Sequence, residues 1–389
     1  MSSSPRSDLG RVVILLATGA GLAAATLYYN QPMLAMLARD LDATPERIGL
    51  VPTMTQLGYA AGIIGFAPLG DRLDRRRVIL AKSSVLIVML AIAALAPSAP
   101  VLVAASLFIG VFATMAQDLV PAAAAIAPAE SRGRVVGTVM TGLLTGILLS
   151  RVVSGAVSQY VSWRAVFGGA AVAIAALLAL FARQLPSFPP TTDRPYFELL
   201  ASMAGLVRKI PALRRAALAQ SLVSMAFSAF WSTLALGLAA PPFELKSSIA
   251  GLFGIAGAAG ALAAPIAGTF SDRRGPAAVA RLGALVCLVS FGAMAIFSRS
   301  IVVLAVGTVV FDAGAQSSLI AHQTIIYAQD PSARSRLNAV LVSSMFIGMA
   351  LGAFLATRVL SSFDFTAVLW MCTGISALAL TARSLPERG

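Results

Sequence analysis

Long apolar runs separated by short polar gaps repeat along almost the whole chain. Each run reaches the roughly 20 residues that an α-helix needs to cross the hydrocarbon core of a bilayer. The pattern predicts about twelve such spans, at residues 11–38, 46–69, 78–96, 101–126, 135–159, 164–182, 216–238, 247–270, 277–297, 300–322, 335–358 and 364–382. The gaps leave little room for water-exposed domains, so we expect an all-α membrane protein with 12 transmembrane helices.

The longest interruption of this pattern covers residues 183–215, which contain several prolines and six basic side chains. Proline and charge argue against a membrane span there. One amphipathic helix, from Tyr196 to Lys209, is predicted inside it. The interruption therefore predicts a cytoplasmic linker (183–215) between an N-terminal six-helix bundle (1–182) and a C-terminal six-helix bundle (216–389).

The two predicted halves share short matching segments at an offset of about 200 residues. Gly70-Asp71-Arg72 matches Ser271-Asp272-Arg273, and the Ala116-Gln117 pair matches Ala315-Gln316. Residues 131–134 match 333–336 in the same way. Six helices repeated in parallel predict two pseudo-symmetric bundles with a substrate site between them at the bilayer midplane.

Composition agrees with a membrane protein and excludes several other classes. Hydrophobic residues make up 58% of the 389 residues and charged residues only 12%, whereas soluble domains carry about 25% charge. The net charge is +13, and nearly all Lys and Arg residues lie in the short gaps rather than on one basic face, which argues against nucleic-acid binding. With the N-terminus in the cytoplasm most of these charges, including Lys82, lie inside, as the positive-inside rule requires, and both termini are then cytoplasmic.

Nothing in the sequence indicates a metal centre, a cofactor or a nucleophilic enzyme site. Both cysteines, Cys287 and Cys372, lie within apolar runs, and the chain has one histidine. A phosphate-binding loop of the G-x-x-x-x-G-K-[ST] type is also missing. Direct use of ATP is therefore not expected, and neither is a cofactor. A membrane enzyme or lipid-handling protein stays open as an alternative from another class.

Three ionisable residues fall at membrane depth, where an unpaired charge is costly and a functional role is the default interpretation. Asp312 lies near the midplane, Arg151 roughly 9 Å from the outer end of its span, and Asp118 roughly 9 Å from the inner end. We predict that Asp312 exchanges a proton or pairs with Arg151, because burial favours the neutral acid and the guanidinium favours the charged form. A permanent salt bridge between the bundles is the structural alternative.

Asp118 and His322, both near the inner ends of their spans, are weaker candidates for proton coupling. Asp118 could instead cap a helix or be hydrated near the cytoplasmic mouth. His322 is the single residue whose ordinary titration falls near neutral pH.

Aromatic and amide side chains at matching depth suggest a cavity for amphipathic organic molecules. The alternative for the apolar members of such faces, such as Phe227 and Phe230, is ordinary helix packing. The candidate lining residues are Tyr29, Asn30, Gln31, Gln56, Tyr59, Gln117, Trp231 and Gln316.

The loop at residues 67–77, APLGDRLDRRR, is similar to the signature G-x-L-a-D-r-x-G-r-k of the major facilitator superfamily. A second copy follows at residues 268–275, and residues 27–32, 163–167, 312–316 and 333–338 resemble a group of bacterial efflux permeases. The chain thus resembles the drug:proton antiporter branch of that superfamily. The resemblance implies a conformational latch at Asp71, Arg72, Arg75, Arg76, Asp272 and Arg273; the arginines could instead serve only to fix the topology.

Four departures from the family pattern bear on the mechanism. Ala67 and Asp74 occupy positions where the signature has glycine, and Ser106 occupies the position of an arginine in the fourth span. The fifth span keeps Gly142 and Gly146 but lacks the proline of the antiporter motif. A uniporter or proton symporter of a sugar or organic acid therefore remains an alternative.

The resemblance implies a monomeric, multi-pass transporter of the bacterial inner membrane that works by alternating access. Its partners would be a small-molecule substrate, protons and membrane lipid. We expect proton-coupled efflux of small amphipathic organic compounds or drugs.

Overall fold

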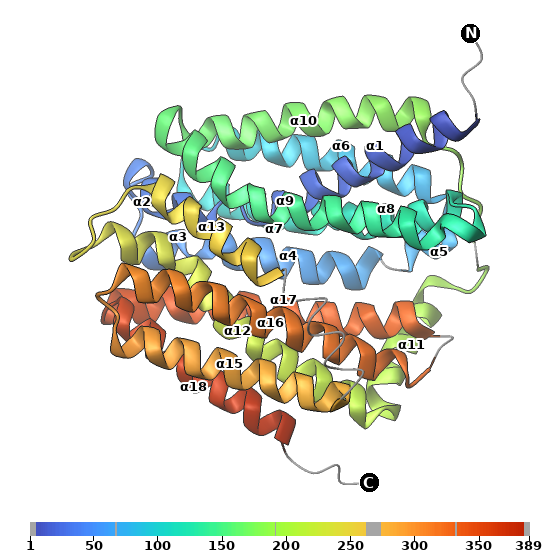
Figure 1. Ribbon diagram of the computed structural model, residues 1–389. Coiled ribbons are helices and arrows are strands. Elements are labelled where there is room, and N and C mark those ends of the chain that lie inside the picture. The colour runs from blue at the N-terminus through green and yellow to red at the C-terminus, as the bar shows by residue number, and fades with distance from the viewer. Residues whose placement is uncertain (1–4, 67, 191, 262–273, 331–332, 385–389) are drawn as a thin grey trace.

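The computed structural model describes residues 5–66, 68–190, 192–261, 274–330 and 333–384, and every regular element in these ranges is a helix (Figure 1). The first half contains α1 (Pro5–Ala25), η1 (Gln31–Met33), α2 (Leu34–Asp40), α3 (Pro45–Ile48), α4 (Leu50–Phe66), α5 (Leu69–Arg72), α6 (Arg75–Ala94), α7 (Ala99–Ala113), α8 (Met115–Ile126), η2 (Ala129–Ser131), α9 (Arg132–Tyr160) and α10 (Trp163–Gln184). The second half contains α11 (Tyr196–Lys209), α12 (Pro211–Ala239), α13 (Ser247–Ala261), α15 (Pro276–Ile296), α16 (Ile301–Tyr327), α17 (Arg334–Ser362) and α18 (Phe365–Ser384).

Within the described ranges, nine helical stretches are long and apolar enough to cross a membrane, and shorter apolar helices lie at Leu9–Ala25 and Ser247–Gly257. The predicted all-α membrane fold is confirmed. The number of twelve spans stays a prediction, in part because the predicted span 247–270 extends beyond the described residues.

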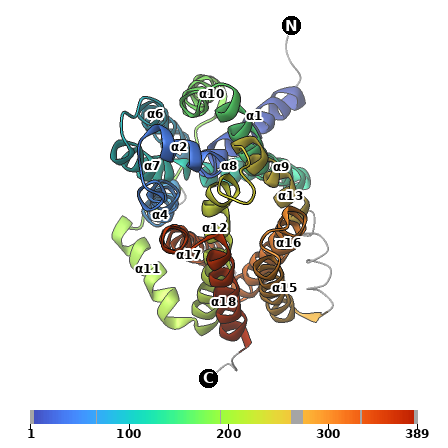
Figure 2. The same ribbon diagram turned by 90° about the vertical axis from the view of Figure 1, so that its left-hand side faces the viewer.

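Two large apolar cores organise the helices. One is built from side chains of α1 to α10, such as Leu16, Leu90 and Phe181, and the other from α12 to α18, such as Phe291 and Leu369. Figure 2 shows the corresponding helices as two groups, with α6, α7 and α10 above and α15, α17 and α18 below. The boundaries at residues 182 and 216 stay a prediction, although α11 matches the helix expected from Tyr196 to Lys209.

The first span is not the continuous helix that the sequence predicted over residues 11–38. Helix α1 ends at Ala25, a turn follows, and the chain resumes as η1 and α2. Pro32 has no backbone N–H to continue an α-helix, and the Thr26 hydroxyl bonds the Ala23 carbonyl at 2.7 Å. The break matters because η1 contacts α9, α12 and α13, which brings Asn30 and Gln31 to the interface between the halves.

Other predicted spans are also interrupted or longer than expected. The second divides at Gly49 into α3 and α4, and the fourth divides at Thr114 into α7 and α8. Helices α9, α12 and α17 each extend to 29 residues. Apolar periodicity marks the membrane-embedded part, while the polar ends that continue the helix carry no such signal.

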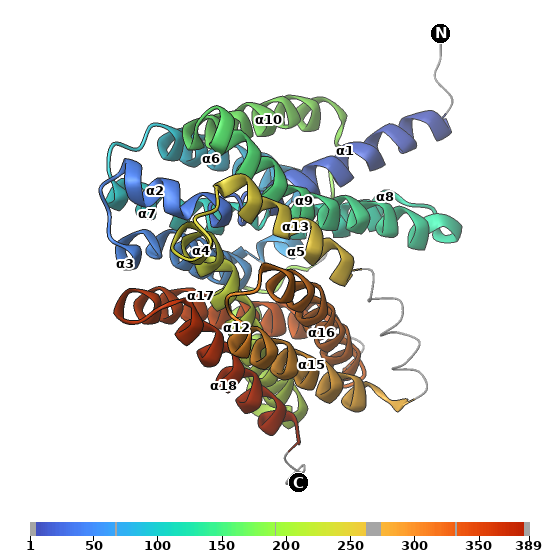
Figure 3. The ribbon, with the colours of Figure 1, turned by 60° about the vertical axis from the view of Figure 1, so that its left-hand side comes forward.

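Two helix pairs, α9 with α13 and α4 with α17, make extensive contacts between the two halves. On one side, a Cβ added at Gly155 of α9 would lie 2.8 Å from the Ser247 carbonyl oxygen and 2.9 Å from the Gly251 Cα of α13. On the other side, Gly49 packs directly against Thr357 of α17. Small residues allow this close approach of helix backbones. In Figure 3, α9 and α13 lie side by side in the region where the halves meet.

Asp74, which replaces a signature glycine, fastens the segment after α10 to the start of α6. Its carboxylate accepts hydrogen bonds from the backbone N–H of Arg76 at 2.9 Å and of Phe188 at 2.9 Å, and from the Ser187 hydroxyl at 3.0 Å. Nearby, the Tyr196 hydroxyl of α11 donates to the Gly65 carbonyl at 2.8 Å. Asp74 thus acts both as the N-cap of α6 and as an anchor for the linker.

The pKa of the Asp74 carboxyl reflects these contacts. Burial acts to raise it, but the hydrogen bonds from Phe188, Arg76 and Ser187, in that order, together with the Arg77 charge, outweigh that effect. The pKa is therefore held below its ordinary value of 3.8. Because the folded-state pKa is lowered, the stabilisation by Asp74 is present above pH 3.8 and is lost as the pH falls through the lowered value.

Replacing Asp74 with alanine is expected to release this anchor and destabilise the α6 N-terminus by about 1–2 kcal/mol. Hydrogen–deuterium exchange at neutral pH should show faster exchange at Phe188 and along residues 185–190. Asp193→Ala, in the exposed part of the same linker, is the control and should leave this exchange unchanged. Equal exchange in both variants would show that Asp74 does not hold the linker.

Candidate functional site

Arg151 is the centre of a buried polar site between the halves. It lies on α9 with 2% of its surface exposed, and its Nε donates to the Gln31 side-chain oxygen at 2.8 Å. Its guanidinium carbon lies 4.7 Å from the ring centre of Tyr28 and 4.1 Å from that of Trp231. Since Trp231 belongs to α12, this cation–π contact joins an N-terminal helix to a C-terminal one.

Asp312 of α16 lies close to the same group, with 4% exposure. A Cβ added at Gly257 would be 3.3 Å from the Trp231 ring and 3.6 Å from a carboxylate oxygen of Asp312, so both side chains border Gly257. Arg151, Tyr28 and Asp312 are within electrostatic range of one another.

The direct pair between Arg151 and Asp312, which was one of the two predicted possibilities, is not formed. No nitrogen of Arg151 lies within 4.0 Å of an Asp312 oxygen, and no described residue forms a salt bridge with either. The reason is that Gln31 and two aromatic faces hold the guanidinium. The sequence placed the two charges at similar depth but could not show what lies between them.

A second line of polar contacts crosses the interface beside Arg151. The Asn30 side-chain nitrogen donates to the Thr55 hydroxyl oxygen of α4 at 3.3 Å. The neighbouring Gln56 accepts from the Ser228 hydroxyl of α12 at 3.0 Å. Asn30, Gln31, Gln56 and Trp231, all predicted as cavity residues, are thus brought together, and Ser228 joins them although nothing in the sequence distinguished it.

Several buried polar atoms in this region have no hydrogen-bond partner. They are Oδ1 of Asn30, Nε2 of Gln31, Nε2 of Gln56, Nη2 of Arg151 and Nε1 of Trp231. An unsatisfied buried polar group costs about 1–3 kcal/mol, so such a concentration at one interface indicates a place where water or a ligand supplies the missing partners.

The remaining predicted cavity residues occupy different positions. Tyr59 accepts a hydrogen bond from Gln117 at 2.9 Å, and its ring centre lies 4.3 Å from that of Phe346 of α17. Tyr29 is buried in the N-terminal core. Gln316 is half-buried on α16, one turn after Asp312. Tyr59 and Gln117 therefore form a separate polar pair rather than part of the Arg151 group.

Asp118 has a partner that the sequence analysis missed. The Lys82 ammonium of α6 lies 2.6 Å from its carboxylate, with side-chain exposures of 4% and 10%, and 4.6 Å from the Phe66 ring centre. The expected helix cap or hydrated mouth is therefore wrong for Asp118. Lys82 lies inside the predicted span 78–96, which was the available signal, but it was counted among the cytoplasmic loop charges.

His322 belongs to a hydrogen-bonded group within the C-terminal half. Its Nδ1 lies 3.1 Å from the Gln220 side-chain oxygen and 3.3 Å from the Ser318 hydroxyl, which itself donates to Gln220 at 2.9 Å. The Nε2 atom is buried without a partner. These contacts are local to α12 and α16 and do not include Asp312.

The predicted latch is only partly described. Arg75 donates to the Gly70 carbonyl at 3.1 Å and Arg76 to the Ala182 carbonyl at 2.6 Å, while Arg72 is exposed. The Asp71 side chain and all of Asp272 and Arg273 lie outside the described residues.

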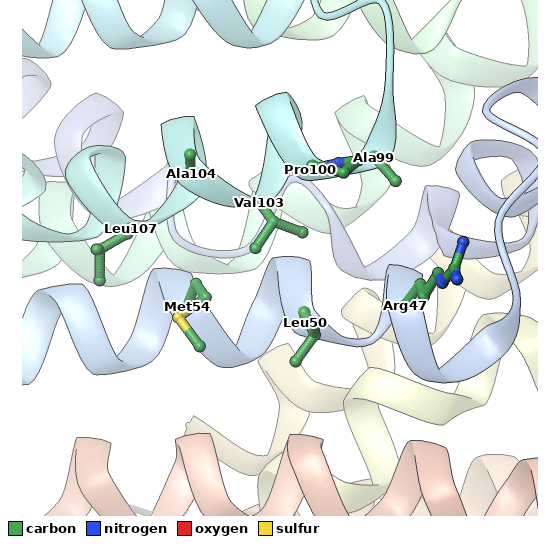
Figure 4. A pocket seen from close by; sticks show the side chains of 8 residues that line it. All are labelled: Arg47, Leu50, Met54, Ala99, Pro100, Val103, Ala104 and Leu107. Atoms are coloured by element: carbon green, nitrogen blue, oxygen red, sulfur yellow. The ribbon is translucent and has the colours of Figure 1, made fainter.

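A shallow apolar groove between α4 and α7 is a poor candidate for specific binding. Figure 4 shows Leu50, Met54, Val103 and Leu107 lining it, with Arg47 at one end. Arg47 is the one charged side chain in this lining, which includes no residue of the Arg151 site. Such a surface fits acyl chains better than a solute that needs hydrogen bonds.

Comparison with known proteins decides the family. A family model described as Major Facilitator Superfamily matches residues 16–247 and 216–389, which together span nearly the whole chain. The chain belongs to this superfamily. It is 39% identical over 355 residues to the uncharacterized transporter YgaY of Escherichia coli O157:H7, covering 91% of this chain and 90% of YgaY.

Two further matches agree with this assignment. The chain is 30% identical over 348 residues to a chloramphenicol resistance protein of Streptomyces lividans, covering 83% and 82% of the two chains. The nucleoside transporter NupG superposes with a TM-score of 0.75 at 16% identity, covering 97% of this chain and 98% of that one, which shows a shared fold. The chain is a multi-pass membrane transporter for a small-molecule substrate and not an enzyme.

Proposed function

We propose that this transporter is a proton-coupled exporter of small amphipathic organic compounds, working by alternating access in the bacterial inner membrane. The observation that carries the proposal is the pair of buried, opposite and separated charges at the interface between the halves: Arg151 on α9 and Asp312 on α16. Export is supported by the similarity to the chloramphenicol resistance protein.

In this mechanism Asp312 binds and releases the proton, and the protonation state of Asp312 changes its electrostatic attraction to Arg151. The ionisable groups in electrostatic range of Asp312 are Arg151, Tyr28 and the Cys287 thiol. When Asp312 is ionised, its attraction to Arg151 across the interface favours one arrangement of the halves. Protonation removes that attraction and favours the other, so that proton and substrate cross in opposite directions.

The remaining parts of the proposal concern the surroundings of this site. Both termini and the linker face the cytoplasm, where lipid phosphates can meet the arginines of the loop at 67–77, and the protein works as a monomer. The loop and its copy at 268–275 form the latch between the bundles 1–182 and 216–389.

Gradient-driven transport in inverted membrane vesicles tests the proposal. An imposed gradient that is acid inside should drive accumulation of a fluorescent dye or a drug, and an uncoupler should abolish it. Purified protein should also release protons when substrate is added. Accumulation that ignores both the gradient and the uncoupler would contradict proton coupling.

A proton symporter of an organic acid is the second candidate, because no described carboxylate forms a salt bridge with Arg151. A substrate carboxylate could bind the guanidinium when Asp312 is protonated. The same purified protein would then take up protons on binding substrate. The sign of the proton change therefore separates export by antiport from import by symport.

A further inference from the structure

Three of the unpaired polar groups around Arg151 can act only as hydrogen-bond donors. Gln31 accepts the Arg151 Nε–H through its oxygen, so its unpaired atom is the NH₂ donor. The Nη2 of Arg151 and the indole Nε1 of Trp231 are donors by their chemistry. We call Gln31, Arg151 and Trp231 the donor triad.

The unpaired atom of Asn30 is, in contrast, an acceptor. Its nitrogen donates to the Thr55 hydroxyl oxygen, which must accept because Thr55 gives its own hydrogen to the Val51 carbonyl at 2.8 Å. The unpaired Oδ1 of Asn30 therefore requires a donor. A single primary carboxamide offers both complements, since its oxygen accepts and its NH₂ donates.

The aromatic side chains and the net charge of the site further restrict the chemical class of ligand that it can bind. Trp231 and Tyr28 present their rings to Arg151, and Phe227 lies 6.2 Å from Trp231 and 5.9 Å from Phe311, measured between ring centres. These side chains would therefore pack favourably against an aromatic ring in the ligand. Arg151 and Asp312 together carry no net charge when both are ionised, so a charged ligand would leave an uncompensated charge in a buried site.

Asp312 supplies the last element. No described residue donates a hydrogen bond to its carboxylate, on which the Arg151 charge acts without direct contact, so the carboxylate can accept one from a ligand hydroxyl. We propose that the site binds neutral aromatic compounds that carry a carboxamide for the donor triad and Asn30, and a hydroxyl for Asp312. This rests on the proposed function and specifies its substrate class. Protonation of Asp312 replaces the charge-assisted hydrogen bond from the ligand hydroxyl with a weaker one to a neutral acid, so that protonation and ligand binding oppose each other.

Binding to purified protein in nanodiscs, without any gradient, tests this assignment. The probe is 4-(hydroxymethyl)benzamide, compared with 4-methylbenzyl alcohol, 4-methylbenzamide and 4-(hydroxymethyl)benzoate. A hydrogen bond to a buried charged group predicts about tenfold tighter binding of the benzamide than of 4-methylbenzyl alcohol. The benzoate should bind more weakly than the benzamide.

Variants separate hydrogen bonding from packing. Trp231→Phe keeps a ring against Arg151 but removes the indole N–H. It should weaken the binding of the benzamide and leave the binding of 4-methylbenzyl alcohol unchanged. Gln31→Glu keeps the acceptor for Arg151 Nε but removes the triad donor, and serves if the first variant does not fold. The control is Trp370→Phe on α18, where the side chain is 52% exposed; both affinities should stay at the wild-type level.

The outcomes are distinct from those of the transport test. Equal weakening of both probes in Trp231→Phe, or tighter binding of the benzoate than of the benzamide, would overturn the assignment. Gradient-driven export of other compounds with no binding of the benzamide would overturn the substrate class but leave the proposed function standing. Selective binding of the benzamide with no proton-coupled transport would overturn the proposed function but leave the substrate class standing.

Discussion

Replacing Asp312 with asparagine is expected to reduce gradient-driven accumulation in inverted vesicles to the level of vesicles without the protein. Asparagine has nearly the same shape but cannot exchange a proton, so the coupled step is lost while the surrounding packing is kept. Substrate exchange in the absence of a gradient should persist, because it requires the halves to move but not to pick up or release protons.

The control for this experiment is Asp193→Asn, which makes the same chemical change in the exposed linker and should transport normally. The protein level in the membrane must be matched between variants. Wild-type accumulation by Asp312→Asn would contradict the assignment of the proton to this carboxyl. Loss of both exchange and accumulation would assign Asp312 a structural role instead.

Removing one partner of the Lys82–Asp118 pair is expected to have the largest effect on stability. Lys82→Met leaves the buried Asp118 carboxylate without its ammonium partner at 2.6 Å, which costs about 3–5 kcal/mol for a buried pair. The reciprocal Asp118→Leu leaves an unpaired buried ammonium. The double variant carries neither charge and should recover most of the loss. Thermal unfolding in detergent, followed by size-exclusion chromatography, measures all three.

The exposed pair Arg194–Glu198, 3.7 Å apart with side-chain exposures of 64% and 57%, provides a matched control. Arg194→Met should leave the unfolding temperature unchanged, because solvent screens an exposed ion pair. A double Lys82/Asp118 variant as unstable as either single one would show that these residues act through packing rather than through their charges.

At the Arg151 site, residue type and depth in the membrane predict which residues are charged and buried, but not how they are arranged. The cost of a charge in hydrocarbon makes Arg151 and Asp312 stand out within their spans. Their separation depends on Gln31, Tyr28 and Trp231, which come from two other segments. Which side chain occupies the space between two charges is decided by packing, and no local pattern encodes it.

The Lys82–Asp118 pair was missed for a different reason. Both residues lie in predicted spans, so the sequence contained the signal, but Lys82 is near the end of its span and was counted as a topology charge. A lysine at a helix end can extend to the interface or turn inward to a carboxylate. The orientation of α6 against α8 makes the second possible here.

The amino-acid sequence alone was enough to identify an all-helical membrane transporter with a repeated architecture, because spans of apolar residues and a loop motif are local properties. It also marked Arg151, Asp312 and Asp118 as charges at membrane depth, although their roles in transport stay predictions. The partners of those residues became known from the folded chain: the break before η1, the stacking of Arg151 between two rings, the Lys82 partner of Asp118 and the anchor at Asp74. Each depends on side chains from segments far apart in the chain, and their meeting follows from helix packing rather than from periodicity.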